Sequence, residues 1–211
     1  MILCIDTITE FAGIALADDK KCHAYLPFEK KGIAEMIIKI IDQALKKARI
    51  KPADLTGVIV IKGPGSFTSL RVALAVANQF AHQLRIPIVG LRTDEWWLGR
   101  TDERPVVYVQ SMNREELYVA GVGAPTIEKL YHLYNLYKMY HFSGQLSDEH
   151  RAKLPADWRE VANLKSPQDT WVTAAQAAAP QLKSRTAYEL IEPFYGKEPT
   201  ITKSKKLTKR L

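Results

Sequence analysis

The fold follows from one stretch of sequence, Gly63-Pro64-Gly65-Ser66-Phe67-Thr68-Ser69-Leu70-Arg71. An apolar run from Gly57 to Ile61, typical of a buried strand, precedes it, and the pattern predicts a helix from Phe67 to about Leu84. Such a loop can hold an anion, because its glycines allow close backbone approach and the helix start offers unpaired N–H groups. A turn in which Ser66 or Thr68 caps the helix explains the same residues without a ligand.

Three short β-rich runs precede this unit and predict an antiparallel meander, because turn residues separate them. The runs are Ile2 to Asp6, Ala12 to Leu16 and Cys22 to Leu26. A helix is predicted from about Gly32 to Arg49, since polar residues recur there at helical spacing. Beyond the glycine loop and its helix, Ile86 to Leu91 is expected to form a strand and Asp94 to Gly99 a short helix.

The second half begins after the polar link Thr101 to Pro105. A hairpin is predicted first, followed by a Tyr/Leu-rich segment, a strand and an alanine-rich helix. These elements are Val106 to Gln110 paired with Leu117 to Val122, Thr126 to Tyr137, Met139 to Phe142, and Val172 to Leu182. The order of elements predicts an α/β fold of two subdomains, residues 1–100 and a smaller one of residues 101–211.

The charge of the chain is unevenly distributed. The formal net charge is +7, and basic residues crowd the last nine positions. They are Lys203, Lys205, Lys206, Lys209 and Arg210. A solubilising tail is the simplest interpretation of a short basic run without aromatics, and contact with a polyanion is the alternative.

The apolar residues predict neither a membrane span nor an export signal. No stretch approaches the roughly 18 uncharged apolar residues that a span needs, and Asp6 interrupts the apolar start. We therefore expect a cytoplasmic protein without membrane contact. Cys4 and Cys22 fall in predicted strands and are expected to be reduced, structural thiols.

The histidines lack the spacing of a metal site or of a catalytic pair. They are His23, His82, His132, His141 and His150. We expect no metal and no catalytic histidine.

Asp6 and Thr7 give a second, weaker signal, because an aspartate closes the first predicted strand ahead of hydroxyl residues. Proteins that hold magnesium phosphate use such a strand-end carboxylate. An ordinary turn between two strands explains the same residues, and Ile8 stands where a phosphate site would favour glycine. The turn is the preferred interpretation.

The predicted helices Gly32 to Arg49 and Phe67 to Leu84 carry more apolar surface than contact with one sheet needs. A second polypeptide would cover such an excess. The predicted contact residues are Ile33, Met36, Ile37, Ile40 and Ala44 on the first helix, and Phe67, Leu70 and Leu74 on the second. A charge at Ile37 is expected to break this contact.

Several of these stretches resemble the TsaB (YeaZ) family. The most specific is Gly63 to Arg71, and the resemblance extends over nearly the whole chain. The other stretches are Ile2 to Glu10, Ile86 to Gly90, Glu115 to Ala120, and Glu192 to Thr202.

The resemblance implies an actin/Hsp70-like (ASKHA, ribonuclease H-like) fold with a reduced second subdomain. It also implies a place in the bacterial machinery that forms threonylcarbamoyladenosine at position 37 of tRNA. The partners implied are the catalytic subunit TsaD, the accessory ATPase TsaE, a second copy of the chain, and tRNA bound through the complex. The residues matching a vestigial phosphate site are Asp6, Thr7, Gly63, Gly65 and Ser66.

The chain departs from the family pattern in ways that bear on catalysis. Ser69 replaces a usual glycine, Gly32 a frequent histidine, and Gln110-Ser111 an aspartate that often follows the strand. After Gly90 no two glycines are adjacent, so no second phosphate loop is present. We therefore predict a non-catalytic subunit that needs no cofactor of its own, with ATP or ADP held, if anywhere, at the interface of the complex.

Three other functions remain open at the level of sequence. An independent ATP-dependent enzyme of the ASKHA type would use Asp6 beside the glycine loop. A peptidase-like protein would need an activated serine or a metal, and no such residue pattern is present. A stand-alone RNA-binding module would need a stacking motif, which the aromatics do not form.

Overall fold

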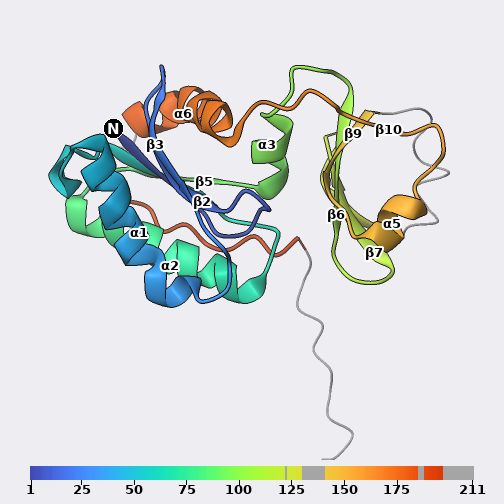
Figure 1. Ribbon diagram of the computed structural model, residues 1–211, viewed down its shortest axis with the longest axis horizontal. Helices are drawn as coiled ribbons and strands as arrows, with labels where there is room; N and C mark the ends of the chain where they lie inside the picture. The colour runs from blue at the N-terminus through green and yellow to red at the C-terminus, as the bar shows by residue number, and fades with distance from the viewer. Residues whose placement is uncertain (122, 130–140, 185–187, 197–211) are drawn as a thin grey trace, which may run out of the picture.

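The computed structural model describes residues 1–121, 123–129, 141–184 and 188–196. It consists of two five-stranded sheets lying side by side, with helices around the first sheet (Figure 1). Among the described residues, no helix combines the length and the apolar composition needed to cross a membrane.

The first sheet has the strand order β3-β2-β1-β4-β5. Its strands are β1 (Ile2–Asp6), β2 (Gly13–Ala17), β3 (Cys22–Pro27), β4 (Gly57–Ile61) and β5 (Ile88–Leu91). The first three strands pair antiparallel, and β4 and β5 continue the sheet in parallel with β1. The predicted meander is confirmed, and so are the two strands that flank the second helix.

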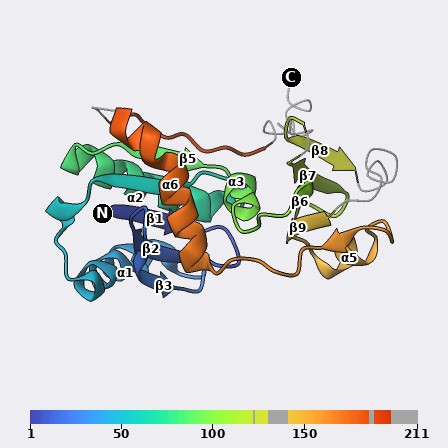
Figure 2. The same ribbon diagram turned by 90° about the horizontal axis from the view of Figure 1, so that it is seen from above.

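Helices cover both faces of this sheet. α1 (Ile33–Ala48) and α2 (Phe67–Leu84) lie together on one face, and α6 (Pro167–Ser184) crosses the other (Figures 1 and 2). α1 and α2 have the predicted bounds to within one residue. α1 ends where Arg49 adopts the left-handed conformation and its N–H bonds the carbonyls of Leu45 and Lys46.

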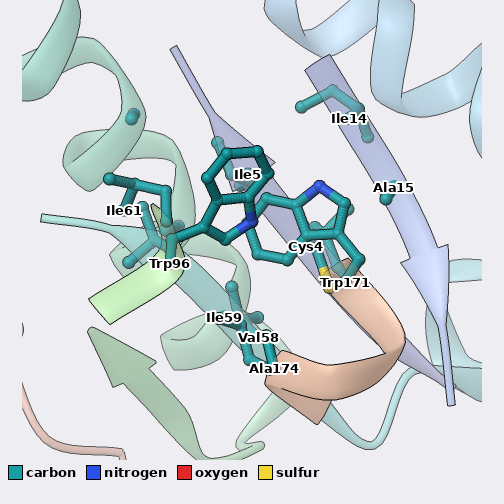
Figure 3. Close-up of a cluster of buried hydrophobic side chains, with 14 of the residues drawn as sticks. Cys4, Ile5, Ile14, Ala15, Val58, Ile59, Ile61, Trp96, Trp171 and Ala174 are labelled. Atoms are coloured by element: carbon teal, nitrogen blue, oxygen red, sulfur yellow. The ribbon is translucent and has the colours of Figure 1, made fainter. Parts of the chain in front are cut away.

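The main core lies on both faces of the first sheet, under α1 and α2 on one side and under α6 on the other. In the part of the core under α6, Trp96 and Trp171 lie with ring centroids 5.8 Å apart, beside branched side chains of β1 and β4 (Figure 3). Both indoles are fully buried. The alanine-rich sequence of α6, including Ala174, allows the helix to approach the sheet closely around them.

The second sheet has the order β10-β9-β6-β7-β8. Its strands are β6 (Val106–Ser111), β7 (Glu116–Ala120), β8 (Thr126–Lys129), β9 (His141–Gln145) and β10 (Arg159–Glu160). The short helix α5 (Asp148–Ala152) lies between β9 and β10 in sequence. The hairpin of β6 and β7 is confirmed. The predicted strand at Met139 to Phe142 corresponds to β9, and α5 and β10 were not predicted. Most of the Tyr/Leu-rich segment, residues 130–137, and the basic tail lie outside the described residues.

The short helix α3 (Thr93–Leu98) joins the two halves of the molecule. Its adjacent tryptophans point to different neighbours: Trp96 contacts Trp171 in the main core, and Trp97 lies 6.1 Å from the ring of Tyr108 on β6. The predicted short helix from Asp94 to Gly99 is thus confirmed. Through its two tryptophans, α3 packs against both halves of the molecule.

The path of the chain differs from the expected division at residue 100. α6 packs on β2, β3, β4 and β5, so this helix completes the first subdomain although it follows the second sheet in sequence. The apolar stripe of α6 needs a sheet face to bury it, and the open face of the first sheet supplies one.

Six of the eight predicted contact residues face inward. They are Ile33, Ile37, Ile40, Ala44, Leu70 and Leu74, each at most 7% exposed. The prediction that these side chains contact another polypeptide is therefore wrong, because the chain's own sheet already covers them. Met36 and Phe67 remain, at 49% and 54% exposed, and Ile38 joins them at 55%.

Because Ile37 is buried and Met36 is half exposed, substitutions at these neighbouring residues of α1 should have effects of different size. Ile37→Ala is expected to lower the free energy of unfolding by about 2–5 kcal/mol, because it leaves a cavity in the core. Met36→Ala should change it by less than about 1 kcal/mol, because half of its side chain is already in water. Urea unfolding of both variants measures the difference, and equal effects would contradict the described packing.

Candidate functional site

The turn after β1 and the glycine loop after β4 meet at one edge of the first sheet. β1 and β4 are parallel neighbours, so their carboxyl ends lie together. Thr7 Oγ1 in the turn donates a hydrogen bond of 2.8 Å to the carbonyl of Ser69 in α2. The predicted phosphate-site residues therefore lie on two adjoining loops: Asp6, Thr7, Gly63, Gly65 and Ser66.

Asp6 uses its carboxylate to close its own turn. Oδ1 accepts the N–H groups of Ile8 at 2.8 Å and Thr9 at 3.0 Å, and Oδ2 accepts the hydroxyl of Thr9. Burial raises the pKa of Asp6, while the hydrogen bonds from Thr9 and Ile8 and the charge of Lys30 oppose this rise. This geometry favours the turn over a magnesium-phosphate ligand.

Ile8 fills the space in front of Gly65. A methyl group added to Gly65 would lie 1.8 Å from Ile8 Cγ2, and Ile8 itself is only 4% exposed. Gly65 is therefore required by the fold, because any side chain there would collide with Ile8. The loop that could hold an anion is packed with one of the chain's own side chains.

The other glycine of the loop lies under a segment from the far end of the chain. We call residues 188–196 the strap. Gly63 has φ +109°, and a methyl group there would lie 2.1 Å from the carbonyl oxygen of Phe194. The N–H of Phe194 donates to the carbonyl of Lys62 at 2.7 Å. The strap thus covers the loop on the side of Gly63.

Ser66 takes the N-cap position of α2, as the simpler interpretation of the sequence expects, but its hydroxyl accepts no bond from a helix N–H. The hydroxyl of Ser69 donates to Ser66 Oγ at 3.3 Å instead. Ser66 is exposed, so water can satisfy the first turn of the helix.

A chain of hydrogen bonds bridges the two sheets next to these loops. Gln145 accepts the N–H of Glu10 at 3.0 Å and donates to the hydroxyl of Tyr108 at 3.2 Å. Tyr108 donates to Gln110 at 2.9 Å, and Gln110 donates to the carbonyl of Pro64 at 3.4 Å. Gln110, a departure from the family pattern, therefore connects β6 to the glycine loop.

A buried carboxylate forms a second bridge, which the sequence did not reveal. Asp94 on α3, 2% exposed, accepts the hydroxyl of Tyr118 at 2.9 Å and binds Arg92 through three contacts of 3.0–3.3 Å. Burial and the negative charge of Asp94 raise the pKa of Tyr118, so the phenol stays protonated and keeps donating. A carboxylate in the first turn of a short helix gives no sign in the sequence that its partner lies on β7.

Three polar residues along one side of α2, Arg71, Asn78 and His82, contact the strap. We call them the polar stripe of α2. Asn78 bonds the backbone of Ile191 in both directions, donating to its carbonyl at 3.0 Å and accepting its N–H at 2.9 Å. His82 meets the ring of Tyr188 edge-on, and Arg71 donates to the hydroxyl of Tyr195 at 3.3 Å. The strap therefore runs along α2 toward the second sheet (Figure 2).

Phe67 stands at the start of α2 in an exposed cluster. The ring of Tyr195 stacks on it at 5.5 Å, and the guanidinium of Arg71 lies 3.9 Å from its centroid. Phe67 is nevertheless 54% exposed. Stacking orders the ring without removing its apolar edge from water, so the edge is available for contact.

Ser111 and His150 form a serine–histidine pair, which the sequence analysis did not identify. Ser111 Oγ lies 2.8 Å from His150 Nδ1, and Nε2 lies 3.1 Å from the carbonyl of Arg114. A carbonyl can only accept, so Nε2 carries the proton and Nδ1 accepts from Ser111. The two residues are 39 positions apart, which sequence spacing cannot relate.

This pair is better explained as a structural link than as a nucleophile. His150 is 2% exposed, and Ser111 Oγ also accepts the N–H of Ser147 at 2.9 Å. The network joins α5 to the β6–β7 hairpin and satisfies the polar groups of the buried imidazole. Within the described ranges, no three His, Cys, Asp or Glu side chains gather closely enough to hold a metal ion.

A five-stranded sheet with helices on both faces and a glycine loop, set beside a second five-stranded sheet, has the arrangement of the actin/Hsp70-like (ASKHA) fold. Solved structures share this fold: YeaZ from Pseudomonas aeruginosa superimposes with a TM-score of 0.72 at 17% identity, covering 92% of this chain and 98% of that one. A P. aeruginosa protein described as similar to peptidase YeaZ gives a TM-score of 0.74 at 17% identity, over 93% and 99%.

Sequence comparison finds similarity to proteins of tRNA threonylcarbamoyladenosine formation. The family model for TsaD, tRNA N6-adenosine threonylcarbamoyltransferase, matches residues 30–132. The tRNA threonylcarbamoyladenosine biosynthesis protein TsaB of Bacillus subtilis (strain 168) is 35% identical over 95 residues, which is 44% of this chain and 42% of the relative. TsaB of Buchnera aphidicola subsp. Schizaphis graminum is 33% identical over 93 residues, 44% of each chain.

The chain is thus similar in sequence to TsaB proteins and in fold to YeaZ. It aligns with less than half the length of the two TsaB relatives.

The contact between Ile8 and Gly65 can be tested by a double-mutant cycle. Gly65→Ala is expected to lower the free energy of unfolding by about 1–3 kcal/mol through overpacking. Adding Ile8→Ala makes room for the new methyl group, so the double variant should be more stable than the sum of the single effects by at least about 1 kcal/mol. Additive effects in urea unfolding would show that the two residues are not in contact.

Proposed function

We propose that this chain is the non-catalytic partner subunit of a TsaD-like transferase, in the machinery that forms threonylcarbamoyladenosine at position 37 of tRNA. The observation that carries this proposal is the filled glycine loop. Ile8 packs on Gly65 and Phe194 packs on Gly63, where an ATP-using member of this fold class needs room for phosphates. The chain has the fold of an ATP-binding protein but no room for phosphates beside its glycine loop.

The proposed partner is similar in sequence to this chain, which supports a contact between corresponding surfaces of the two proteins. The TsaD family model matches residues 30–132, which include all of α1 and α2. A TsaD-like protein therefore carries the same helical layer. Two such layers can pack face to face about a pseudo-twofold axis, as in contacts between identical subunits.

The docking face that we propose is the edge of the first sheet where α1 and α2 begin. β3 and β4 both run in the direction of β1, so α1, which follows β3, and α2, which follows β4, start at the same edge of the sheet. Met36, Ile38 and Phe67 lie in the first two turns of these helices and are about half exposed, with Met36 and Ile38 on opposite sides of α1. Exposed apolar side chains near one edge of a sheet are typical of contact with another protein.

Two rival functions have less support. An independent ATP-dependent enzyme would need the loop that Ile8 fills. The Ser111–His150 pair is the observation that favours a peptidase, but the imidazole is buried and its second nitrogen faces a carbonyl rather than a carboxylate. Contact with a TsaE-like ATPase or with a second copy of the chain is compatible with the proposed docking face, and binding measurements separate these partners.

The double variant Met36→Glu/Phe67→Glu tests the docking face. It is expected to weaken binding to the TsaD-like protein of the same genome at least 100-fold, because two carboxylates would be buried without partners. Titration calorimetry measures the affinity, and thermal unfolding shows whether the fold is intact.

The matched control is Gln43→Glu/Gln79→Glu, which adds the same two carboxylates at exposed polar positions of α1 and α2. The control should bind the TsaD-like protein within a few-fold of the unmodified chain. A folded Met36→Glu/Phe67→Glu variant with undiminished affinity would refute the docking face, and an unmodified chain that ignores the TsaD-like protein would refute the proposed function.

The filled loop predicts that ATP does not stabilise the isolated chain. Magnesium ATP at 50 times its dissociation constant would stabilise the fold by about 2.3 kcal/mol. We expect no change in the midpoint of thermal unfolding in millimolar magnesium ATP, and no ATP hydrolysis. A clear upward shift, or turnover by the chain alone, would favour the independent enzyme.

A further inference from the structure

The chain passes between the two halves of the molecule and back again. Residues 99–105 lead from α3 to β6, and residues 161–166 lead from β10 to α6 (Figures 1 and 2). We call these two stretches the crossing segments. Two bodies joined by short loops can rotate about them, because a few loop residues absorb the change in backbone angles. A hinge between the halves would therefore lie in the crossing segments.

The crossing segments are bound to each other through one pair of residues. The N–H of Lys165 donates to the carbonyl of Arg100 at 2.7 Å. In return, Nε and Nη2 of Arg100 donate to the carbonyl of Lys165 at 3.2 and 3.1 Å. Each residue thus holds the backbone of the other, and the arginine side chain supplies two of these three bonds.

The guanidinium of Arg100 is buried, although a charge in the interior of a protein is costly. Arg100 is only 4% exposed, and its Nη1 has no hydrogen-bond partner among the described residues. Burial lowers the pKa of Arg100, and the negative charge of Glu10 opposes this change. An arginine keeps its proton in spite of such a change, so the cation needs other contacts to offset its loss of hydration.

Aromatic rings supply these contacts. The guanidinium carbon of Arg100 lies 4.0 Å from the ring centroid of Phe11, 4.8 Å from that of Trp97 and 5.5 Å from that of Trp96. These are distances of cation–π attraction, which is strongest where water is excluded. Lysine could not replace Arg100 here, because an ammonium has neither the fork of donors nor the flat face that stacks on a ring.

Phe11 extends the contact to the second half of the molecule. It lies in the turn between β1 and β2, and the N–H of the preceding residue, Glu10, donates to Gln145 on β9 at 3.0 Å. Arg100 therefore connects both crossing segments to a turn that is itself bonded to the second sheet.

We propose that Arg100 locks the hinge formed by the crossing segments and so holds the two halves of the molecule at one fixed angle. A rotation of the halves would pull the guanidinium off the ring of Phe11 or break its two bonds to Lys165. The inference is independent of the proposed function, because it concerns the isolated chain. Its consequence for binding is that the two halves present one rigid surface to a partner.

The experiment measures the distance between the halves by double electron–electron resonance of two spin labels. The labels are attached at Gln43→Cys on α1 and Ala152→Cys on α5, both at exposed positions. Cys22→Ser removes the half-buried native thiol, and Cys4 is fully buried and takes no label. The labelled chain should give one narrow distribution of distances.

Arg100→Met removes the charge and the fork of donors but keeps a long side chain. Its distribution should be at least about twice as wide, because the crossing segments are then free to act as a hinge. Arg100→Lys keeps the charge without the fork or the flat face, so it should widen the distribution as well.

The matched control is Lys165→Met. It removes a cation from the same pair of residues, with its ion pair to Asp102 at 2.8 Å, but leaves the carbonyl that Arg100 binds. The control should keep the narrow distribution, because an ion pair at the surface contributes little.

Thermal unfolding shows which variants are folded. A wide distribution in the chain with Arg100 in place overturns the proposal, and so does a narrow one in folded Arg100→Met. A Lys165→Met variant that widens the distribution as much as Arg100→Met also overturns it, because the ion pair with Asp102 would then hold the segments. If Arg100→Met does not fold, Arg100→Lys decides, since a wider distribution supports the lock and an unchanged one refutes it.

Discussion

The packing of Ile8 against Gly65 is the contact on which the site depends. A glycine loop that holds a phosphate needs open space in front of its backbone N–H groups. Here an isoleucine occupies that space, and the glycine is needed so that the isoleucine fits. Internal packing therefore explains the glycine without a ligand.

Side chains also bridge the two halves of the molecule at this edge. Gln110 and Gln145 link them through Tyr108, and Asp94 links them through Tyr118. The bonds made by Gln110 and Asp94 are buried, where a hydrogen bond is electrostatically stronger than at the surface. The relation of the two halves is thus fixed by side chains, and a rigid surface binds a partner with less loss of conformational entropy.

The sequence predicted the elements well wherever the pattern was local. The meander, α1, α2 and the glycine loop were correct to within a residue or two, because strand alternation, helical spacing and glycines act over short distances. What covers an apolar face was not predictable. The apolar arc of α1 indicated burial, but the pattern is the same whether a sheet or another chain buries it, and here the sheet does. The polar stripe of α2 suggested exposure to solvent, but Asn78 in this stripe binds the strap, 113 positions away.

Long-range pairing also explains why the site was only partly anticipated. Asp6, Thr7 and the loop glycines were singled out from local sequence, and they lie together as expected for the ends of parallel strands. Ser111 with His150, Asp94 with Tyr118, and Gly63 with Phe194 depend on how the second half folds back. Residue type alone predicts that a buried polar group has a partner but not which one.

The inward orientation of most of α1 and α2 limits how this chain can recognise another protein. Ile37 and Leu70 serve the core, so only a few exposed apolar side chains and their polar neighbours remain for contact. Affinity in such interfaces comes from a small number of well-packed anchors, and specificity comes from the charges around them. Phe67 fits the role of an anchor because Tyr195 and Arg71 hold its ring in place before any partner arrives. Since Tyr195 belongs to the strap, the segment that covers the glycine loop at Gly63 also holds the ring of Phe67 in place. One segment of the chain therefore both packs on the loop and shapes the surface proposed for docking.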